Sequence, residues 1–384
     1  MPFQARNTYQ AVVRLPIKPP PLTSPFIAAV VMAELVVAVP PLLRADQAEQ
    51  RYNEAVQAAV EKCAADTAGQ TCFICMDGAA AEGLVRGCAC RGGAGFAHVS
   101  CMARQAEVVV ERGAGGLGFE RWGTCGLCEQ KYHGVVACAL GWACWNQYVG
   151  RAEMDMTRIK AMNQLGNGLS EVEHYEDALI AGEAELAMYR RLDAPVEQML
   201  VAQNNLAITY ACLGRPEQAL RVSQEVYFGR LKLFGEENRE TLVAAMNYAY
   251  YLIKLNRSEE AKALLRKTMP VARRVLGESD TMLRMRGCFA DALLNDPGAT
   301  LDDLREAVTT LEEVERIARQ VLGGSHPDTK GIENKLQNAR AALRASALSS
   351  KATEDTCSRL REEIARLKAE NAALRERRTR RRLG

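Results

Sequence analysis

Cysteine and histidine side chains gather between residues 72 and 128 in four close pairs. The pairs are Cys72 with Cys75, Cys88 with Cys90, His98 with Cys101, and Cys125 with Cys128. One or two intervening residues let both members of a pair reach one ion from a tight turn, as in structural zinc knuckles. Eight ligands suffice for two closed tetrahedral sites with no position for a catalytic water. We therefore predict two structural zinc ions (Zn2+) per chain and no catalytic residue.

Disulfide bonds are the alternative use of paired cysteines, but they need an oxidising compartment. Nothing else in the sequence indicates secretion. Of the thirteen cysteines, seven belong to the pairs and the other six are scattered: Cys63, Cys138, Cys144, Cys212, Cys288 and Cys357. This pattern suits a reducing compartment, in which thiols serve as zinc ligands or as small core residues.

The order and spacing of the ligands resemble the RING-CH, or RING-variant, zinc finger. Seven residues separate Cys90 from His98, and two separate His98 from Cys101. The related plant homeodomain finger has the same ligand order but usually fewer residues before its histidine, and it is the alternative. The resemblance implies a cross-braced fold with two ligand sets. One zinc would be held by Cys72, Cys75, His98 and Cys101, and the other by Cys88, Cys90, Cys125 and Cys128.

RING-CH fingers typically recruit a ubiquitin-conjugating enzyme and promote transfer of ubiquitin to a substrate lysine, so their work is to position a loaded partner. In that family the apolar residue inside the first ligand pair touches the conjugating enzyme, and Ile74 occupies that place. A tryptophan commonly follows the sixth ligand by a few residues. Here none follows Cys101 closely, and Trp122 lies just before Cys125. This departure keeps a non-enzymatic finger open as a second hypothesis.

The composition is that of an ordinary protein with room for two or three domains. The chain has 384 residues, a net charge of +2 and 25% charged residues, which implies no general attraction to nucleic acid or membranes. We divide it into six parts. They are a flexible arm with an apolar helix (1–43), a helix (44–66), the finger (67–133), a bridging helix (134–157), helical repeats (158–345), and a coiled coil with a basic tail (346–384).

An apolar run at residues 26–39 is bracketed by Pro25 and by Pro40 and Pro41. It has 14 residues and contains Glu34, whereas a membrane-spanning helix needs about 20 apolar residues. We expect a packed helix that does not cross a bilayer. Because the preceding residues are basic and lack acids, a membrane segment or a targeting signal is the alternative.

Three aromatic residues follow the finger at a spacing of three: Trp142, Trp145 and Tyr148. This spacing places them on one face of a helix. We expect the helix to pack between the finger and the C-terminal domain, and an exposed partner site is the alternative.

Residues 158–345 form a repeating pattern. The segments 200–219 and 242–261 coincide at an offset of 42, with small residues at equivalent places such as Ala207 and Ala249. Small residues where two helices approach, surrounded by large apolar ones, are typical of helical-hairpin repeats. The region resembles tetratricopeptide repeats (TPRs) of the kinesin-light-chain type, in four copies with a capping helix at 330–345.

Stacked repeats produce a concave groove that usually binds proteins or peptides. Asn205 and Asn247 occupy the same position in two repeats. Asparagine there resembles the residues that hold the backbone of an extended peptide in related grooves. Ordinary polarity of a helix surface is the alternative.

The C-terminal region carries a heptad pattern at residues 357–374. Its inner positions are Cys357, Leu360, Ile364, Leu367, Asn371 and Leu374. The pattern predicts a short parallel coiled coil between two copies of the chain, in which Asn371 selects the register. The following residues 375–384 hold six arginines and one glutamate. We expect a solvated charged end, and a nuclear-import or nucleic-acid patch is the alternative.

These observations predict a mainly α fold, with a small cross-braced two-zinc RING-CH finger followed by a TPR α-solenoid and a short coiled coil. The predicted function is a ubiquitin-protein ligase, whose finger recruits a conjugating enzyme and whose TPR groove binds a protein substrate. The alternative is a non-enzymatic interaction scaffold. We expect no nucleic-acid or membrane partner and a cytoplasmic, intracellular location, with a nuclear or membrane-associated location as the alternatives.

Overall fold

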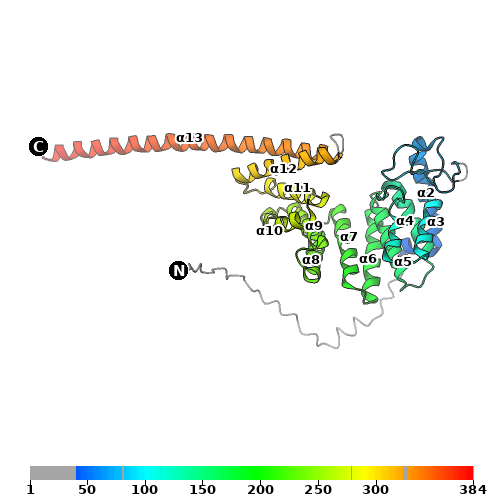
Figure 1. Cartoon of the computed structure of the whole chain (residues 1–384). Coiled ribbons are helices and arrows are strands. Elements are labelled where there is room, and N and C mark those ends of the chain that lie inside the picture. Colours follow the sequence, from blue (N-terminus) through cyan, green and yellow to red (C-terminus); the bar gives the residue numbers. More distant parts are fainter. Residues whose placement is uncertain (1–39, 80–81, 114, 278, 323–326, 384) are drawn as a thin grey trace, which may run out of the picture. The chain divides into compact units, whose positions relative to one another are not determined.

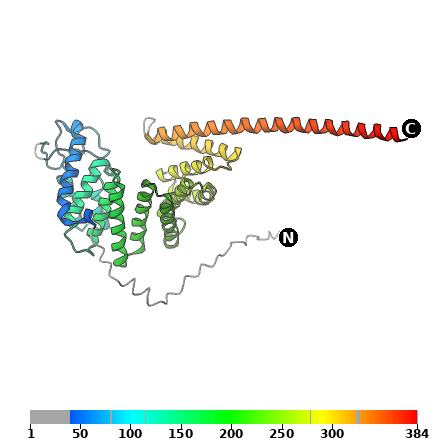
Figure 2. The ribbon, with the colours of Figure 1, turned by 180° about the vertical axis from the view of Figure 1, so that it is seen from behind.

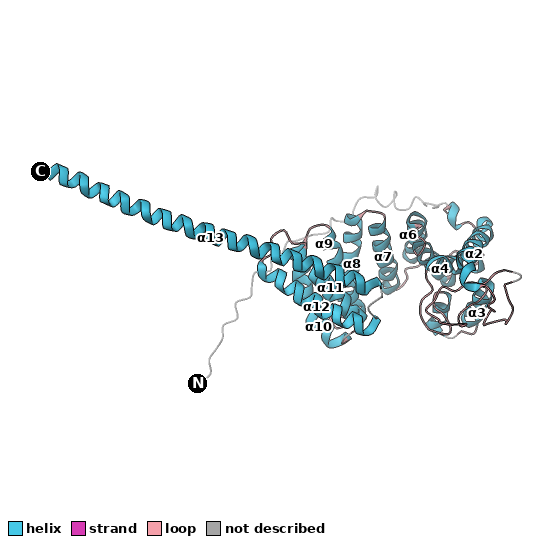
Figure 3. Ribbon diagram, turned by 90° about the horizontal axis from the view of Figure 1, so that it is seen from above, coloured by secondary structure: helices cyan, strands magenta, loops and turns pink. Residues whose placement is uncertain are grey.

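The computed structural model of the chain describes residues 40–79, 82–113, 115–277, 279–322 and 327–383 (Figure 1). The predicted apolar run at 26–39 lies outside these ranges. The described residues form helices and loops without a strand (Figure 3), which confirms the mainly α prediction. The elements are η1 (Pro41–Leu43), α2 (Ala45–Thr67), α3 (Val99–Glu111), η2 (Gly115–Trp122), α4 (Gly134–Tyr148), α5 (Met156–Ser170), α6 (Tyr175–Arg191), α7 (Val196–Cys212), α8 (Pro216–Phe234), α9 (Arg239–Lys254), α10 (Ser258–Leu276), α11 (Asp280–Leu294), α12 (Leu301–Leu322) and α13 (Pro327–Leu383).

The finger consists of loops around α3 and η2, and α2 packs beside it. Two isolated antiparallel bridges tie its loops together, one between Val85 and Ala97 and one between Thr124 and Lys131. Its small core includes Leu84, Val85 and Val99, all with 1% or less of their surface exposed. A core of this size contributes little folding energy, so the finger depends on its metal ions.

Helix α4 is apolar on all sides, and a helix of that kind is stable only when it is surrounded by other elements. It packs against α2, α3 and α5. Trp142, Trp145 and Tyr148 are all buried in this core, so they do not form an exposed partner site. The close approach of α4 to α5 depends on small residues, since a Cβ at Gly168 would lie 2.7 Å from the Ala137 carbonyl oxygen.

Helices α5 to α12 form an array of four antiparallel pairs, and each helix packs against the next along the chain (Figures 1 and 2). The solenoid-like array confirms the predicted TPR fold. The helix boundaries follow the expected capping chemistry. Asn238 caps α9 through its side chain, Ser279 caps α11, and α8 and α10 end at Gly235 and Gly277 with φ of 79° and 58°. Asparagine and serine oxygens satisfy free N–H groups at helix starts, and glycine adopts positive φ at helix ends.

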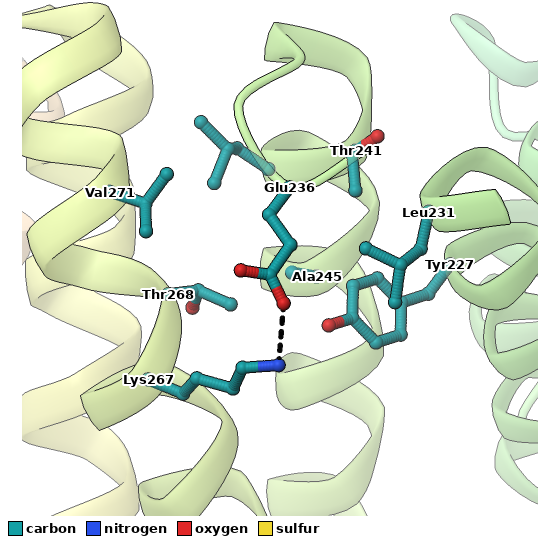
Figure 4. Close-up of a pocket in the computed structure, with 9 residues that line it drawn as sticks. Tyr227, Leu231, Glu236, Thr241, Ala245, Lys267, Thr268 and Val271 are labelled. Atoms are coloured by element: carbon teal, nitrogen blue, oxygen red, sulfur yellow. Dashed lines mark hydrogen bonds and ion pairs between the residues drawn. The ribbon is translucent and has the colours of Figure 1, made fainter. Parts of the chain in front are cut away.

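A small cavity lies between α8, α9 and α10 (Figure 4). Tyr227 and Val271 contribute to its wall, and an ion pair between Lys267 Nζ and Glu236 Oε1, 2.7 Å apart, lies beside it. Its volume is about 10 Å³, which is close to the minimum for one water molecule. The inside of the array is therefore close-packed here and offers no ligand site.

Helix α13 runs from Pro327 to Leu383 without a break. The expected capping helix and the expected coiled coil are thus parts of one helix. Its first turns pack on α12 through buried Leu336 and Ala339, whereas every residue from 347 to 373 is exposed. The heptad residues lie in this exposed part, and the coiled coil stays a prediction.

Among the described helices, none combines the length and the apolar character that a membrane crossing requires.

Candidate metal centres and an adjoining cleft

The first cluster of metal-ligating atoms consists of Cys72, Cys75, His98 and Cys101, whose ligand atoms all lie within 4.8 Å of one another. The Nδ1 atom of His98 lies 3.4 Å from Cys75 Sγ and 3.7 Å from Cys101 Sγ. Around tetrahedral zinc, with bonds of about 2.3 Å to sulfur and about 2.0 Å to nitrogen, such neighbours lie about 3.5 Å apart. The cluster therefore has the donor set and the spacing of a zinc site.

The second cluster consists of Cys88, Cys90, Cys125 and Cys128, again within 4.8 Å. The Sγ atoms of Cys90 and Cys125 are 3.8 Å apart, and two thiolates on one tetrahedral zinc lie about 3.8 Å apart. The structure thus separates the eight ligands into the two groups that the RING-CH resemblance implied. These groups alternate along the chain, which is the cross-brace, and they fit two zinc ions.

The two CxxC pairs fold into the same turn. In the first, the Cys72 N–H donates to Asp77 O, the Met76 N–H donates to Cys72 O, and the Ile74 N–H points at Cys72 Sγ at 3.4 Å. In the second, the N–H groups of Cys125, Glu129 and Leu127 make the equivalent bonds to Gln130 O, Cys125 O and Cys125 Sγ. Each turn ends in positive φ, 67° at Met76 and 57° at Glu129. The backbone is therefore shaped for a metal at both pairs.

Backbone N–H groups near a thiolate also stabilise its charge. Burial would raise the pKa of the Cys72 thiol, but hydrogen bonds from the backbone of Cys75, His98 and Ile74 outweigh burial and lower the pKa to about 7. The backbone N–H of Gln130 likewise lowers the pKa of Cys128 to about 7. The backbone near these two cysteines thus favours the thiolate, which is the form that binds zinc.

The orientation of His98 is held by a contact that the sequence does not reveal. Its Nε2 lies 3.0 Å from the Gly78 carbonyl oxygen, while Nδ1 faces the thiols. A proton on Nε2 donated to this carbonyl leaves the Nδ1 lone pair for the metal, the usual arrangement for a ligating histidine.

Two further residues that sequence reasoning missed support the second cluster. Gly95 has φ of 81°, and a Cβ on it would lie 2.6 Å from Cys90 Cβ and 3.3 Å from Cys88 Sγ. Arg86 braces the same loop, because its Nη1 donates to Gly92 O at 2.8 Å and its guanidinium lies 4.2 Å from the centre of the Phe96 ring. The glycine-rich sequence after Cys90 was the only feature of the sequence that indicated this loop.

The apolar residues of the two turns lie at the surface of the finger. Leu127 is 51% exposed and Ile74 is half-buried. Trp122, in contrast, is 1% exposed and packs edge-on against Tyr148, with ring centres 5.8 Å apart. Trp122 is thus a core residue and does not stand in at the surface for the tryptophan that is missing after Cys101.

A cleft of about 700 Å³ adjoins the finger. One wall is formed by η2 and by Thr124 and Lys131, which flank the Cys125–Cys128 turn. Most of the rest is formed by α5, α6 and α7. Asn205 lines this cleft, whereas Asn247 is not among its lining residues and donates instead to Asn204 Oδ1 at 3.0 Å. The two predicted partner-binding asparagines therefore have different surroundings.

A buried carboxylate lies at the base of the cleft. Glu185 is 2% exposed, and its Oε2 accepts a hydrogen bond of 3.0 Å from Asn163 Nδ2. Burial raises its pKa to about 7, although the bonds from Asn163 and Tyr189 oppose the rise. The energy cost of burying this group without a cation is reflected in the raised pKa.

Two segments of the chain match known protein families. Residues 72–128 match the RING-variant domain, and residues 198–274 match the tetratricopeptide repeat. The chain thus contains a RING-variant domain and TPRs, as predicted. A comparison with curated proteins gave no match.

Solved structures similar to this chain include two crystal structures of the nearly identical TPR-like repeats of a putative kinesin light chain from Podosopora anserina. They are 20% and 18% identical, cover 53% and 58% of this chain and 97% of theirs, and give TM-scores of 0.41. The crystal structure of BtubC (BKLC) from P. vanneervenii is 12% identical, covers 69% of this chain and 90% of its own, and gives a TM-score of 0.43.

Proposed function

We propose that this protein is a RING-CH-type ubiquitin-protein ligase that acts by positioning its partners. The observation that carries the proposal is the RING-variant domain at residues 72–128 with both four-ligand clusters assembled. Closed zinc sites leave no position for a catalytic hydroxide. The finger's contribution is therefore to hold a ubiquitin-conjugating enzyme close to its target.

The two apolar turn residues supply the surface for the conjugating enzyme. The backbones of Ile74 and Leu127 are held by hydrogen bonds to the first cysteine of each turn, so these residues lose little entropy on binding. Helix α3 lies beside the second turn, since Gln105 Oε1 is 3.3 Å from where a Cβ on Gly126 would stand. Gln105 thus occupies the part of α3 where an aromatic residue would extend this surface.

The ligase proposal predicts that Ile74→Ala abolishes ubiquitin transfer. Truncating a central apolar anchor of an interface typically costs about 2 kcal/mol, roughly thirtyfold in affinity. The measurement is autoubiquitination across a panel of conjugating enzymes, together with zinc content and thermal stability, which should not change. Ile180→Ala makes the same truncation at a half-buried site in α6 and should retain activity, and Gln105→Trp should raise it.

The alternative is a non-enzymatic scaffold. It is favoured because α3 contains no tryptophan and the buried Trp122 of η2 cannot offer one to a conjugating enzyme in its place. Autoubiquitination that stays at the same background level in wild type and Ile74→Ala, with every conjugating enzyme, would reject the ligase proposal in favour of the scaffold.

The TPR region supplies the second partner site of the proposal. Asn205 lines a cleft whose opposite wall belongs to the finger, so a protein held there would lie beside the conjugating enzyme's docking surface. Short distance between the two partners is what a positioning ligase requires. The exposed heptad of α13 would join two such chains through residues 357–374.

A further inference from the structure

The cleft beside the finger has an acidic lining. Three carboxylates and one ammonium group line it, Glu120, Glu171, Glu185 and Lys131. Glu185 is the buried one at its base, and its partners are Asn163 and Tyr189. A carboxylate that is almost fully buried next to an open cleft favours a cationic ligand, because a cation restores the interaction that burial took away.

A row of side-chain amides crosses the same wall. Asn167 Nδ2 donates to Asn163 Oδ1 at 3.1 Å, and Asn205 Nδ2 lies 3.5 Å from Asn167 Oδ1. Each amide has two N–H donors and an oxygen with two lone pairs, so the row uses only part of its hydrogen-bonding capacity. The unused donors and acceptors can pair with the N–H and C=O groups of an extended peptide.

Two apolar side chains of α7 stand at the surface next to the amides. Val201 is 47% exposed and Ile208 is 45% exposed, and both line the cleft. Branched aliphatic groups in such a place gain from contact with an apolar side chain. The cleft therefore combines contacts for peptide backbone, for one apolar side chain and for one cation.

We propose that this cleft binds an extended segment of a partner protein, with a lysine or arginine side chain directed at Glu185 and the segment's backbone on the amides of Asn163, Asn167 and Asn205. Charge complementarity selects a basic segment, since acids outnumber bases three to one among the lining residues. Binding of a basic segment in this cleft does not require ligase activity. It rests on the proposed function only where the bound partner is taken to be a substrate for ubiquitination.

The test uses the full-length, zinc-loaded protein and pools of fluorescent octapeptides, acetylated and amidated at their ends. In each pool one central position is fixed as lysine, arginine, glutamine or glutamate, and the others are randomised. Fluorescence anisotropy should show binding to the lysine and arginine pools that is at least tenfold tighter than to the glutamine pool, and no binding to the glutamate pool. Equal binding to all four pools would overturn the proposal.

Two variants locate the binding site. Glu185→Gln keeps the shape of the side chain and the contact to Asn163, and it should weaken binding of the lysine pool at least tenfold. Glu183→Gln changes an exposed acid of the same helix that is not part of the cleft, and it should leave binding unchanged. If Glu185→Gln destabilises the fold, Ile208→Arg at an exposed position blocks the cleft and serves instead. Unchanged binding in a folded cleft variant would overturn the proposal.

Three further outcomes of these experiments are informative. Binding that appears only after removal of residues 375–384 would show that the chain's own arginine-rich tail is the occupant and would overturn the proposal of a partner segment. Autoubiquitination is measured in parallel. Loss of peptide binding in Glu185→Gln with normal autoubiquitination supports the proposal, whereas an inactive wild type that still binds the lysine pool rejects only the ligase function.

Discussion

At the scale of single residues, the second zinc cluster depends on a glycine that is not a ligand. Gly95 has positive φ and lies against Cys90 and Cys88. Gly92, in the same loop, also has positive φ, 61°, but a Cβ there would meet no atom within 4 Å. The two glycines therefore separate two effects, the strain of a left-handed backbone and a direct collision with the zinc ligands.

We expect Gly95→Ala to lose the second zinc ion, because the added methyl group displaces the thiols of Cys90 and Cys88. Gly92→Ala should keep both ions and lose only about 1–2 kcal/mol of stability from backbone strain. Zinc content per chain, measured by mass spectrometry under native conditions, distinguishes the two. Two ions in both variants would show that the loop yields and that Gly95 is not required.

At the scale of elements, the connection between α11 and α12 has a structural role. The fourth repeat carries about five extra residues, near 295–299, in this connection. In the structure, Asp296 from this connection pairs with Lys262 of α10, and their side chains are only 7% and 4% exposed. Ser258 Oγ donates to Asn295 O at 3.2 Å in the same place. The extra residues thus supply the carboxylate that pairs with a buried lysine of the neighbouring repeat.

Asp296→Asn should destabilise the repeats by about 3 kcal/mol at neutral pH, since removing one partner of a buried pair leaves its charge poorly compensated. Glu259, 2.7 Å from Lys262, keeps part of the compensation. Urea unfolding monitored by circular dichroism measures the loss. Asp302→Asn, which breaks an exposed pair with Arg305, should change stability by less than about 0.5 kcal/mol.

The same pair gives the repeats an acid-sensitive contribution. The hydrogen bond from Lys262 is the main reason why the pKa of Asp296 lies below its ordinary value of 3.8. A lowered pKa means that the stabilisation is present above about pH 4 and is lost as the pH falls through the folded-state pKa. The difference between wild type and Asp296→Asn should therefore shrink below pH 4. A difference that stays constant to pH 2 would show that Asp296 acts through packing alone.

At the scale of the whole molecule, the finger and the repeats share one core. Trp122 of the finger lies in the same cluster of buried residues as Leu165 of α5 and Leu206 of α7. The later helices, α8 to α12, belong to a separate cluster that contains no finger residue among the described residues. The molecule therefore has one part that depends on zinc and one that depends on stacked helices.

Chelation of both zinc ions should unfold the finger and leave the later repeats intact. Hydrogen exchange followed by mass spectrometry should show fast exchange in α3 and in the loops of residues 72–98, and unchanged protection in α9 to α12. Protection in α5 to α7 should fall in part, because these helices lose Trp122 as a neighbour. Loss of protection throughout the chain in step with zinc release would show that the solenoid has no stability of its own.

Self-association through α13 is the second prediction at this scale. Leu360, Ile364 and Leu367 are about half exposed on a helix that has no partner in the described chain at this point, and burying them in a parallel dimer would remove that apolar surface from water. Crosslinking at the exposed Cys357 should capture a dimer. Leu367→Lys should weaken it about thirtyfold or more, since an inner charge costs on the order of 2 kcal/mol.

The control is Ala369→Lys, which adds the same charge at an outer heptad position and should leave the dimer intact. Sedimentation at tens of micromolar that shows a monomer for the wild type would reject the coiled coil.

Local spacing determined much of this protein. Residues close together in the chain determine the eight ligands and the surrounding RING-variant sequence, the repeat period near 42 and the caps of α8 to α11. Helical turns and zinc turns follow such local rules. For this reason the finger, the TPR fold and both metal clusters could be predicted without coordinates.

Only the tertiary structure decided which residues lie side by side across long separations. The burial of Trp122 against Tyr148, the contact of His98 Nε2 with Gly78, and the pairing of Asp296 with Lys262 all depend on how loops and helices far apart in sequence pack. The cleft is the clearest case. Its acids and asparagines come from η2, from α5 and the residue that follows it, and from α6 and α7. No pattern within one helix predicts that they face one another, because that depends on the angle at which successive helices stack.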